Sequence, residues 1–226
     1  MVELLAQLIP NVVTKVPELL KCLGQTLYMM LITGSITFGI GIVLAVILTV
    51  TRRGDILENI LVWTILDKII NFFRSVPFII LIALLIPVTR AIVGTAIGVR
   101  GAIVPLVFGT VPFFTRQMES ALAGIDRGSI EAAQALGTSP GGIIFRVYLK
   151  ESVPGIIRGT TITFISLVGL TAMAGAVGGG GLGDFAIRYG YQRYQTDVTI
   201  VTVIVLILIV TIIQGLGAFF AGKTTH

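Results

Sequence analysis

Residues 129–155 read SIEAAQALGTSPGGIIFRVYLKESVPG, a polar segment broken by glycine and proline that lies between two long apolar stretches. Ser129 can cap a helix here, and Glu131 in its first turn suits the positive N-terminal end of the helix dipole. Gly137 is well placed to end that helix, because glycine adopts the left-handed conformation at low steric cost. The segment is therefore predicted to start with a short helix and a sharp turn.

A second helix is expected directly after this turn. Thr138 or Ser139 can cap it, and Pro140 suits its first position. The first helix carries three alanines that keep it narrow: Ala132, Ala133 and Ala135. Such a rod can enter a groove on a partner protein. Capping signals alone are equally typical of a cytoplasmic loop that has no partner.

The composition indicates an integral membrane protein. Of the 226 residues, 55% are hydrophobic and only 12% are charged, whereas a soluble domain typically has about 25% charged residues. The net charge of +5 fits cationic loops beside membrane lipids, so no nucleic-acid partner is expected. Cys22 is the only cysteine, and the only histidine, His226, is the last residue, so we expect no metal site and no cofactor.

The apolar pattern predicts an all-α, polytopic membrane protein with a single transmembrane domain, residues 1–226. A helix needs about 20 residues to cross a bilayer, and shorter apolar runs can borrow a neighbouring turn. Five transmembrane helices are predicted, at approximately residues 23–51, 69–88, 102–122, 157–177 and 198–222. The polar segment, taken as residues 124–155, lies between the third and the fourth.

Several stretches depart from a simple apolar run. Residues 56–73 have apolar side chains at helical spacing with charges between them, which predicts an amphipathic helix along the inner interface that turns into the bilayer. The second span should bend at Pro77. The fourth should stop near Val177, because the glycine-rich run 178–183 is too flexible to propagate a helix. Residues 184–197 are predicted as an external polar loop rich in tyrosine.

The distribution of lysine and arginine orients the chain. An odd number of spans puts the two termini on opposite sides of the membrane. The side with the Arg52–Arg53 turn, the polar segment and the C-terminus collects more cations, as cytoplasmic loops do. We therefore expect the N-terminus outside and the C-terminus in the cytoplasm. Because the first residues include Glu3, Pro10 and Lys15, we expect no cleavable signal peptide.

The polar segment resembles the EAA signature of bacterial ABC importer permeases. The likeness rests on Glu131-Ala132-Ala133, on Gly137 and on the aliphatic pair Val147 and Leu149. The family motif usually continues with proline, whereas Lys150 follows here. The resemblance implies the ABC type I importer permease fold and a docking segment that sits in a cleft of a separate ATPase subunit. The docking residues that it implies are Ser129, Glu131, Ala132, Ala133, Gly137 and Pro140.

Further motifs resemble the permease of the methionine ABC importer over most of the chain. They are Asn71–Ile80 (NFFRSVPFII), Pro87–Arg90 (PVTR), Ala102–Leu106 (AIVPL), Gly175–Asp184 (GAVGGGGLGD) and Arg188–Tyr191 (RYGY). This likeness implies a non-catalytic subunit that takes up L- and D-methionine across the bacterial inner membrane by alternating access. It also implies a homodimer, two copies of a cytoplasmic ABC ATPase and an extracytoplasmic methionine-binding lipoprotein.

Met173 lies in the fourth predicted span, within LTAMAG at residues 170–175. A single methionine in a span is usually ordinary packing or a lipid contact. A flexible apolar side chain between small residues can also meet its twin across a two-fold axis and seal a pore. The family resemblance favours this gate. The nearby glycine run is not a nucleotide site, because no Lys-Ser/Thr pair follows it.

Other functions remain as alternatives. The chain could be the permease of an ABC importer for another amino acid or small solute, because selectivity in this design lies largely in the binding protein. An ion-driven secondary transporter is less favoured, since no Asp or Glu lies mid-span and no internal repeat is found. An intramembrane enzyme would need a nucleophile and base, or metal ligands, within the spans, and the only histidine is at the C-terminal end.

Overall fold

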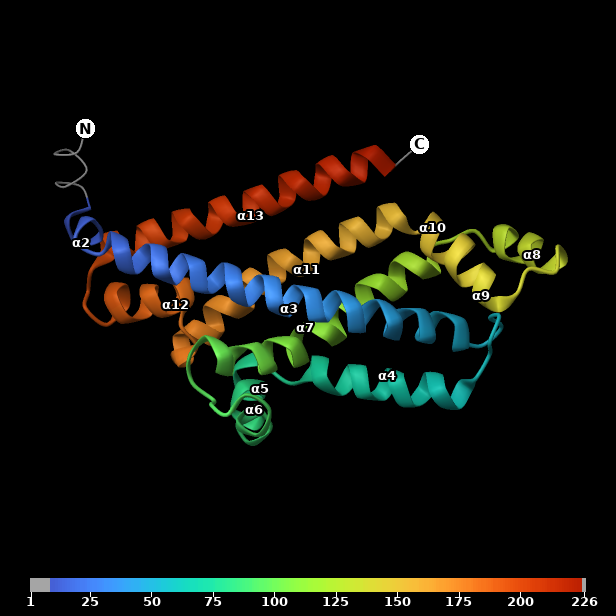
Figure 1. The fold of residues 1–226 in the computed structure, drawn as a ribbon, viewed down its shortest axis with the longest axis horizontal. Helices are drawn as coiled ribbons and strands as arrows, with labels where there is room; N and C mark the ends of the chain where they lie inside the picture. Colours follow the sequence, from blue (N-terminus) through green and yellow to red (C-terminus); the bar gives the residue numbers. More distant parts are fainter. Residues whose placement is uncertain (1–8, 225–226) are drawn as a thin grey trace. The chain divides into compact units, whose positions relative to one another are not determined.

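The computed structural model describes residues 9–224, and all regular secondary structure in that range is helical (Figure 1). The predicted all-α class is therefore confirmed. Two residues used in the predictions above, Glu3 and His226, lie outside the described residues. The chain divides into two compact units, which we describe separately. Unit 1 comprises Met1–Ser35, Pro77–Phe108 and Phe164–Ile213, and unit 2 comprises Ile36–Val76, Gly109–Thr163 and Gln214–His226.

Four helical stretches within residues 9–224 are long and apolar enough to cross a membrane, by length and composition. They are α3 (Val16–Thr51), α7 (Gly98–Ala123), α11 (Val153–Ala174) with its continuation η2 (Gly175–Gly179), and α13 (Thr196–Thr224). Four of the predicted spans fall within these stretches. Each stretch runs through both units.

The second predicted span is divided among three short helices. α4 (Ile60–Ser75) is capped by Asn59, whose side chain accepts a hydrogen bond from Val62 N, and it ends before an extended Val76. Proline disfavours helical geometry in the residue that precedes it, so the bend expected at Pro77 is a complete interruption. The chain then continues as α5 (Phe78–Leu84) and α6 (Ile86–Val93). The count of five membrane-crossing helices stays a prediction.

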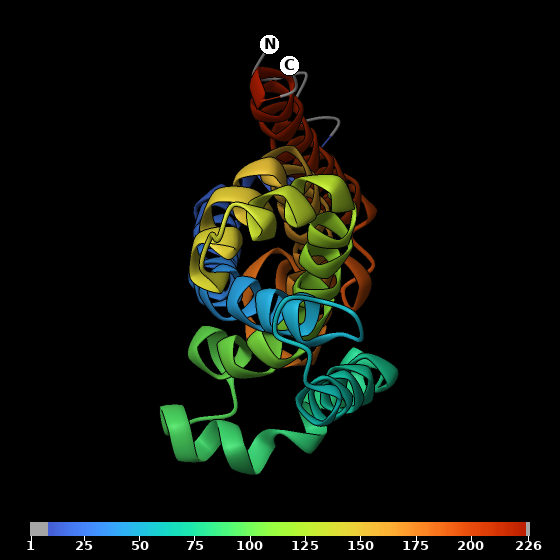
Figure 2. The ribbon, with the colours of Figure 1, turned by 90° about the vertical axis from the view of Figure 1, so that its right-hand side faces the viewer.

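Unit 2 contains the polar segment. Besides parts of the long helices and α4, it comprises α8 (Arg127–Ala135), α9 (Pro140–Ile143), η1 (Ile144–Tyr148) and α10 (Leu149–Glu151). Two views show α8 folded back beside α9 (Figures 1 and 2). The buried core of this unit consists of Ala45, Val50, Phe114, Met118, Leu122, Ile130, Ile143 and Tyr148. Because three of these residues come from the polar segment, the segment is a packed part of the unit.

Unit 1 corrects the prediction of a polar loop at residues 184–197. After the glycine-rich interruption, the chain forms α12 (Gly181–Phe185) and η3 (Ala186–Tyr191), and α13 already begins at Thr196. Leu182 and Phe185 are fully buried, and Tyr189 packs against the same cluster. These residues recur at helical spacing, so their burial stabilises a helix. The polar residues between them led to the prediction of a loop. The backbone is non-helical at Val177 and Gly178, where the sequence predicts the fourth span to end.

Candidate functional site

The first helix of the polar segment starts earlier than predicted. α8 begins at Arg127, and Asp126 occupies the N-cap position with an extended backbone. The prediction that Ser129 caps this helix was wrong, because Ser129 lies inside it and Glu131 falls in the second turn. Aspartate is common at the N-cap position, and here it precedes Ser129, although its side chain makes no capping hydrogen bond.

The turn at the end of α8 has the predicted geometry. Gly137 adopts a left-handed conformation with φ +71°. Its N–H donates to the carbonyl oxygen of Gln134 at 2.9 Å, and the N–H of Thr138 donates to that of Ala133 at 3.0 Å. This pair of bonds is the Schellman arrangement, which satisfies carbonyl groups at the end of a helix. The turn is therefore fixed by the backbone.

The start of the second helix is also confirmed. The Ser139 side chain accepts a hydrogen bond from Gly142 N at 3.3 Å, and Pro140 occupies the first position of α9. The helix then widens into the π-helical η1 and narrows again in α10, where Lys150 lies. Helix, turn and second helix thus follow one another as the sequence predicts.

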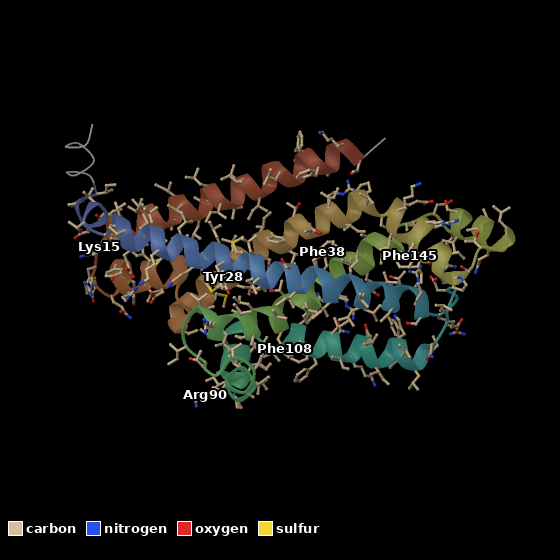
Figure 3. All side chains as sticks on the ribbon, viewed as in Figure 1. Lys15, Tyr28, Phe38, Arg90, Phe108 and Phe145 are labelled. Atoms are coloured by element: carbon tan, nitrogen blue, oxygen red, sulfur yellow. The ribbon has the colours of Figure 1, made fainter. Side chains whose placement is uncertain are left out.

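The outer face of the segment combines small residues with two exposed large apolar residues. Glu131, Ala132, Gly137 and Pro140 are exposed. Leu136 is 85% exposed and Phe145, labelled in Figure 3, is 72% exposed. The sequence analysis missed these two residues, which lie just before the turn at Gly137 and in η1 after α9. Ala133, by contrast, is half-buried and packs against the core of unit 2.

A buried hydrogen bond connects the segment to the turn that follows α3. Tyr148 is 1% exposed, and its hydroxyl donates to Asp55 Oδ1 at 2.7 Å. Asp55 also accepts from Ile56 N at 2.8 Å and, through Oδ2, from Arg52 Nε at 3.0 Å. Burial and the bond to the carboxylate both raise the pKa of Tyr148, so the phenol keeps its proton at neutral pH. No sequence pattern predicted this contact, because the two residues lie far apart along the chain.

A small pocket lies beside this contact, within unit 2. Its lining residues are Gly54, Asp55, Ile56, Arg127, Ile130, Glu131, Gln134 and Tyr148. Lower on the segment, Ser152 is buried and its hydroxyl donates to the carbonyl oxygen of Ala121 on α7 at 3.2 Å. The segment is thus anchored at two points, while its outer face is open.

A second group of charged residues in unit 2 surrounds Arg116 on α7. Its guanidinium pairs with Asp67 of α4, with Glu119 at 2.6 Å and with Asn71 Oδ1 at 3.0 Å. These contacts compensate for the cost of a cation within the third predicted span. No group of three or more His, Cys, Asp or Glu side chains among residues 9–224 is arranged to hold a metal ion.

Met173 belongs to unit 1, whereas the predicted docking residues belong to unit 2. Its side chain is 41% exposed, while the next residue, Ala174, is buried. A Cβ added to Gly169, one turn earlier, would meet no atom within 4 Å. This face of α11 is therefore open in the single chain, as either a lipid contact or a second copy would require.

Comparison with known proteins identifies the family. Residues 38–226 match the model of the family described as binding-protein-dependent transport system inner membrane component. The chain belongs to this family. It is thus a permease subunit of the ABC transporter family and a multi-pass component of the inner membrane.

The permease is most informatively compared with MetI proteins. It is 48% identical over 208 residues to the probable D-methionine transport system permease protein MetI of Vibrio cholerae, covering 92% of each chain. The identity to the D-methionine transport system permease protein MetI of Escherichia coli K12 is 46% over 157 residues, covering 70% of this chain and 72% of that one. The resemblance to methionine importer permeases is therefore confirmed.

Solved structures agree with the sequence comparison. An inward-facing structure of the MetNI methionine ABC transporter matches with a TM-score of 0.90 and 43% identity, covering 92% of the permease and 96% of that chain. A second crystal form of that transporter gives a TM-score of 0.87 at 44% identity, covering 89% of the permease and 94% of that chain. An amino acid ABC transporter at 17% identity and a TM-score of 0.78 shares the fold alone, covering 95% of the permease and 98% of that chain.

Proposed function

We propose that this permease is the transmembrane channel of an ATP-driven importer that takes up L- and D-methionine by alternating access. The observation that carries the proposal is the 48% identity to the probable D-methionine permease of Vibrio cholerae over 92% of both chains. Hydrolysis of ATP belongs to a separate ATPase, and this chain contributes no catalytic group. The substrate passes between two copies of the permease.

The segment from α8 to α10 is the proposed docking element for the ATPase. Leu136, which follows α8, and Phe145, in η1, are the exposed large apolar residues of this segment. Apolar and aromatic side chains that fill pockets on a partner dominate the affinity of protein interfaces. Glu131, Ala132, Gly137 and Pro140 supply the exposed surface around them, Ala133 packs against the core of unit 2, and Ser129 lies half-buried within the same helix.

The proposed assembly contains two permeases, two ATPases and an extracytoplasmic methionine-binding lipoprotein. The N-terminus faces outward and the C-terminus lies in the cytoplasm. Met173 forms the gate, because its exposed face on α11 can meet the same face of the second copy. An unbranched apolar side chain can seal a pore and swing aside when the copies separate.

Uptake in living cells tests the transport proposal. A methionine auxotroph without its own high-affinity importers receives the genes for the permease, its ATPase and its binding protein. We expect growth on low concentrations of L- or D-methionine, and no growth when the permease gene is omitted. Growth restored for a different amino acid but not for methionine would assign the channel to another substrate.

Thiol labelling tests the orientation, in a Cys22→Ala background. A cysteine in place of Tyr194, which is 92% exposed, should react with an impermeant reagent from outside. A cysteine in place of the exposed Lys150 should react only after permeabilisation. Gly190 is unsuitable for this purpose, because a side chain there would overlap Thr199. The reverse labelling pattern would invert the topology and remove the docking assignment.

A further inference from the structure

One buried carboxylate connects the end of α3 to the docking segment. The Asp55 side chain is only 4% exposed. A buried charge is costly unless it is paired and hydrogen-bonded. Both oxygens of Asp55 are satisfied: Oδ1 accepts from Ile56 N and the Tyr148 hydroxyl, and Oδ2 accepts from Arg52 Nε. The carboxylate therefore has partners on both sides: Arg52 and Ile56 at the turn, and Tyr148 on the segment.

The turn that carries Asp55 is itself bound to the end of α3. Leu57 N donates to the carbonyl oxygen of Val50 at 3.0 Å, and Asn59 N donates to that of Thr51 at 2.9 Å. Within the turn, Gly54 N donates to the Glu58 carboxylate at 2.9 Å. These bonds hold the position of Asp55 relative to the last turn of α3, so a displacement of this carboxylate is passed to the helix.

Tyr148 is fixed to the docking segment in the same way. Its ring packs in the unit 2 core together with Ile130 of α8 and Ile143 of α9. The hydroxyl is the polar end of an otherwise apolar contact. A phenylalanine would fill the same volume, so packing alone does not require the hydroxyl. What the hydroxyl adds is a short, directional bond to a charged acceptor.

We propose that Tyr148 and Asp55 are positioning residues that make the docking segment and the end of α3 move together when the ATPase displaces the segment. This inference rests on the proposed function, because it assumes an ATPase that docks on α8 and α9. Apolar packing allows the two elements to slide against each other. A directional bond between a core tyrosine and a buried carboxylate resists that sliding. A displacement of the docking segment is therefore transmitted to the end of α3.

The test compares assembly with transport in the complete importer. Permease, ATPase and binding protein are purified together and reconstituted in liposomes, and methionine uptake per ATP hydrolysed is measured. Tyr148→Phe should keep normal co-purification of the ATPase but lower uptake per ATP by about tenfold, the scale of losing a hydrogen bond to a charged group. Asp55→Asn, which keeps an acceptor oxygen but loses the charge, should give a smaller loss. Tyr28→Phe is the matched control, because that tyrosine is half-exposed on α3.

A covalent cross-link in place of the hydrogen bond between Tyr148 and Asp55 distinguishes a role in movement from a role in folding. In a Cys22→Ala background, Asp55→Cys and Tyr148→Cys are combined and joined by a short bifunctional thiol reagent. We expect low uptake per ATP before the reaction and recovery after it.

Three outcomes would contradict the proposal. If Tyr148→Phe keeps the wild-type uptake per ATP, the hydrogen bond is not needed to transmit the displacement of the segment to α3. If uptake falls only in proportion to the amount of assembled complex, Tyr148 and Asp55 serve folding and not movement. An unmodified importer that binds no ATPase or transports no methionine would reject the proposed function and this inference with it.

Discussion

Gly137 fixes the turn between α8 and α9 in the proposed docking segment. Its φ of +71° lies in the left-handed region, where side chains with a Cβ are strained. The two backbone hydrogen bonds of the turn form only in that conformation. A residue that cannot adopt it would redirect α9 away from α8.

Replacement of Gly137 provides a test at one position. We expect Gly137→Val to lower methionine uptake several-fold, because a β-branched residue in the left-handed region costs roughly 1–2 kcal/mol. Gly137→Asn is the matched control and should retain most uptake, since asparagine tolerates this conformation. Both variants are compared for membrane insertion and for ATPase co-purification. Equal uptake by the two variants would show that the turn does not matter for coupling.

Single residues also show what a sequence reveals and what it hides. The turn at Gly137 and the start of α9 at Pro140 were predictable, because both follow from local backbone preferences. The cap at Ser129 was mispredicted by a few residues, since the helix already begins after Asp126. The contact between Tyr148 and Asp55 was not predictable, because it depends on how distant segments pack.

Among the helical elements, the docking segment has an outer face that differs from an ordinary surface helix. Its large apolar side chains, Leu136 and Phe145, are exposed on either side of the turn. Its inner face carries Ile130 and Ile143, which are buried in the core of unit 2. The outer face thus carries two large apolar side chains among polar and small ones, as expected if a partner covers them.

Polar substitution of the outer face tests this interpretation. Leu136→Ser and Phe145→Ser should each weaken binding of the ATPase to the detergent-solubilised permease. The expected loss is about 2 kcal/mol, or roughly 30-fold in Kd, which is typical of an interface hot spot. Leu136→Met keeps the apolar surface and should bind nearly as well as the unmodified permease. Unchanged ATPase binding by both serine variants would place the docking surface elsewhere.

The glycine-rich region of unit 1 shows how packing overrides a local signal. The run 178–183 interrupts the helix, as its composition predicts. The chain resumes as α12 because Gln25 and Thr26 of α3 accept hydrogen bonds from Gly181 N and Leu182 N, both at 2.9 Å. Those partners come from the other end of the sequence, which explains why a loop was predicted at 184–197.

The close approach of α12 to α11 gives a prediction about stability. A Cβ on Gly183 would overlap the backbone carbonyl of Ala172. We expect Gly183→Ala to destabilise the permease by about 1–3 kcal/mol or to prevent its folding, as overpacking does. Gly24→Ala is the control, because a Cβ there meets nothing within 4 Å. Thermal unfolding in detergent measures both, and equal melting temperatures would contradict the packing described for α12.

For the molecule as a whole, the composition and the lengths of the apolar runs predicted most of the helical architecture. Four of the predicted spans fall in long apolar helical stretches, while the second is broken at Pro77 into shorter helices. The apolar run there was short, and the residue before proline avoids helical geometry. The likeness to MetI proteins extends over 92% of the chain, so the family could be recognised from motifs before the fold was known.

The proposed homodimer makes a prediction at Met173. In a Cys22→Ala background, Met173→Cys should form a disulfide with its twin in the nucleotide-free importer, because a disulfide requires Cα atoms within about 7 Å. The yield should fall when the ATPases are trapped closed with ATP. Cross-linking at Gly169→Cys but not at Met173→Cys, in every nucleotide state, would contradict the gate and leave Met173 as an ordinary packing residue.

Methionine uptake into liposomes tests the central claim most directly. The permease is reconstituted with its ATPase and binding protein, and labelled methionine is supplied on the side of the binding protein. We predict uptake that requires ATP on the ATPase side and that stops when the binding protein or the ATPase is omitted. Uptake driven by an ion gradient without ATP would contradict the account, and so would an ATP-consuming complex that leaves methionine outside.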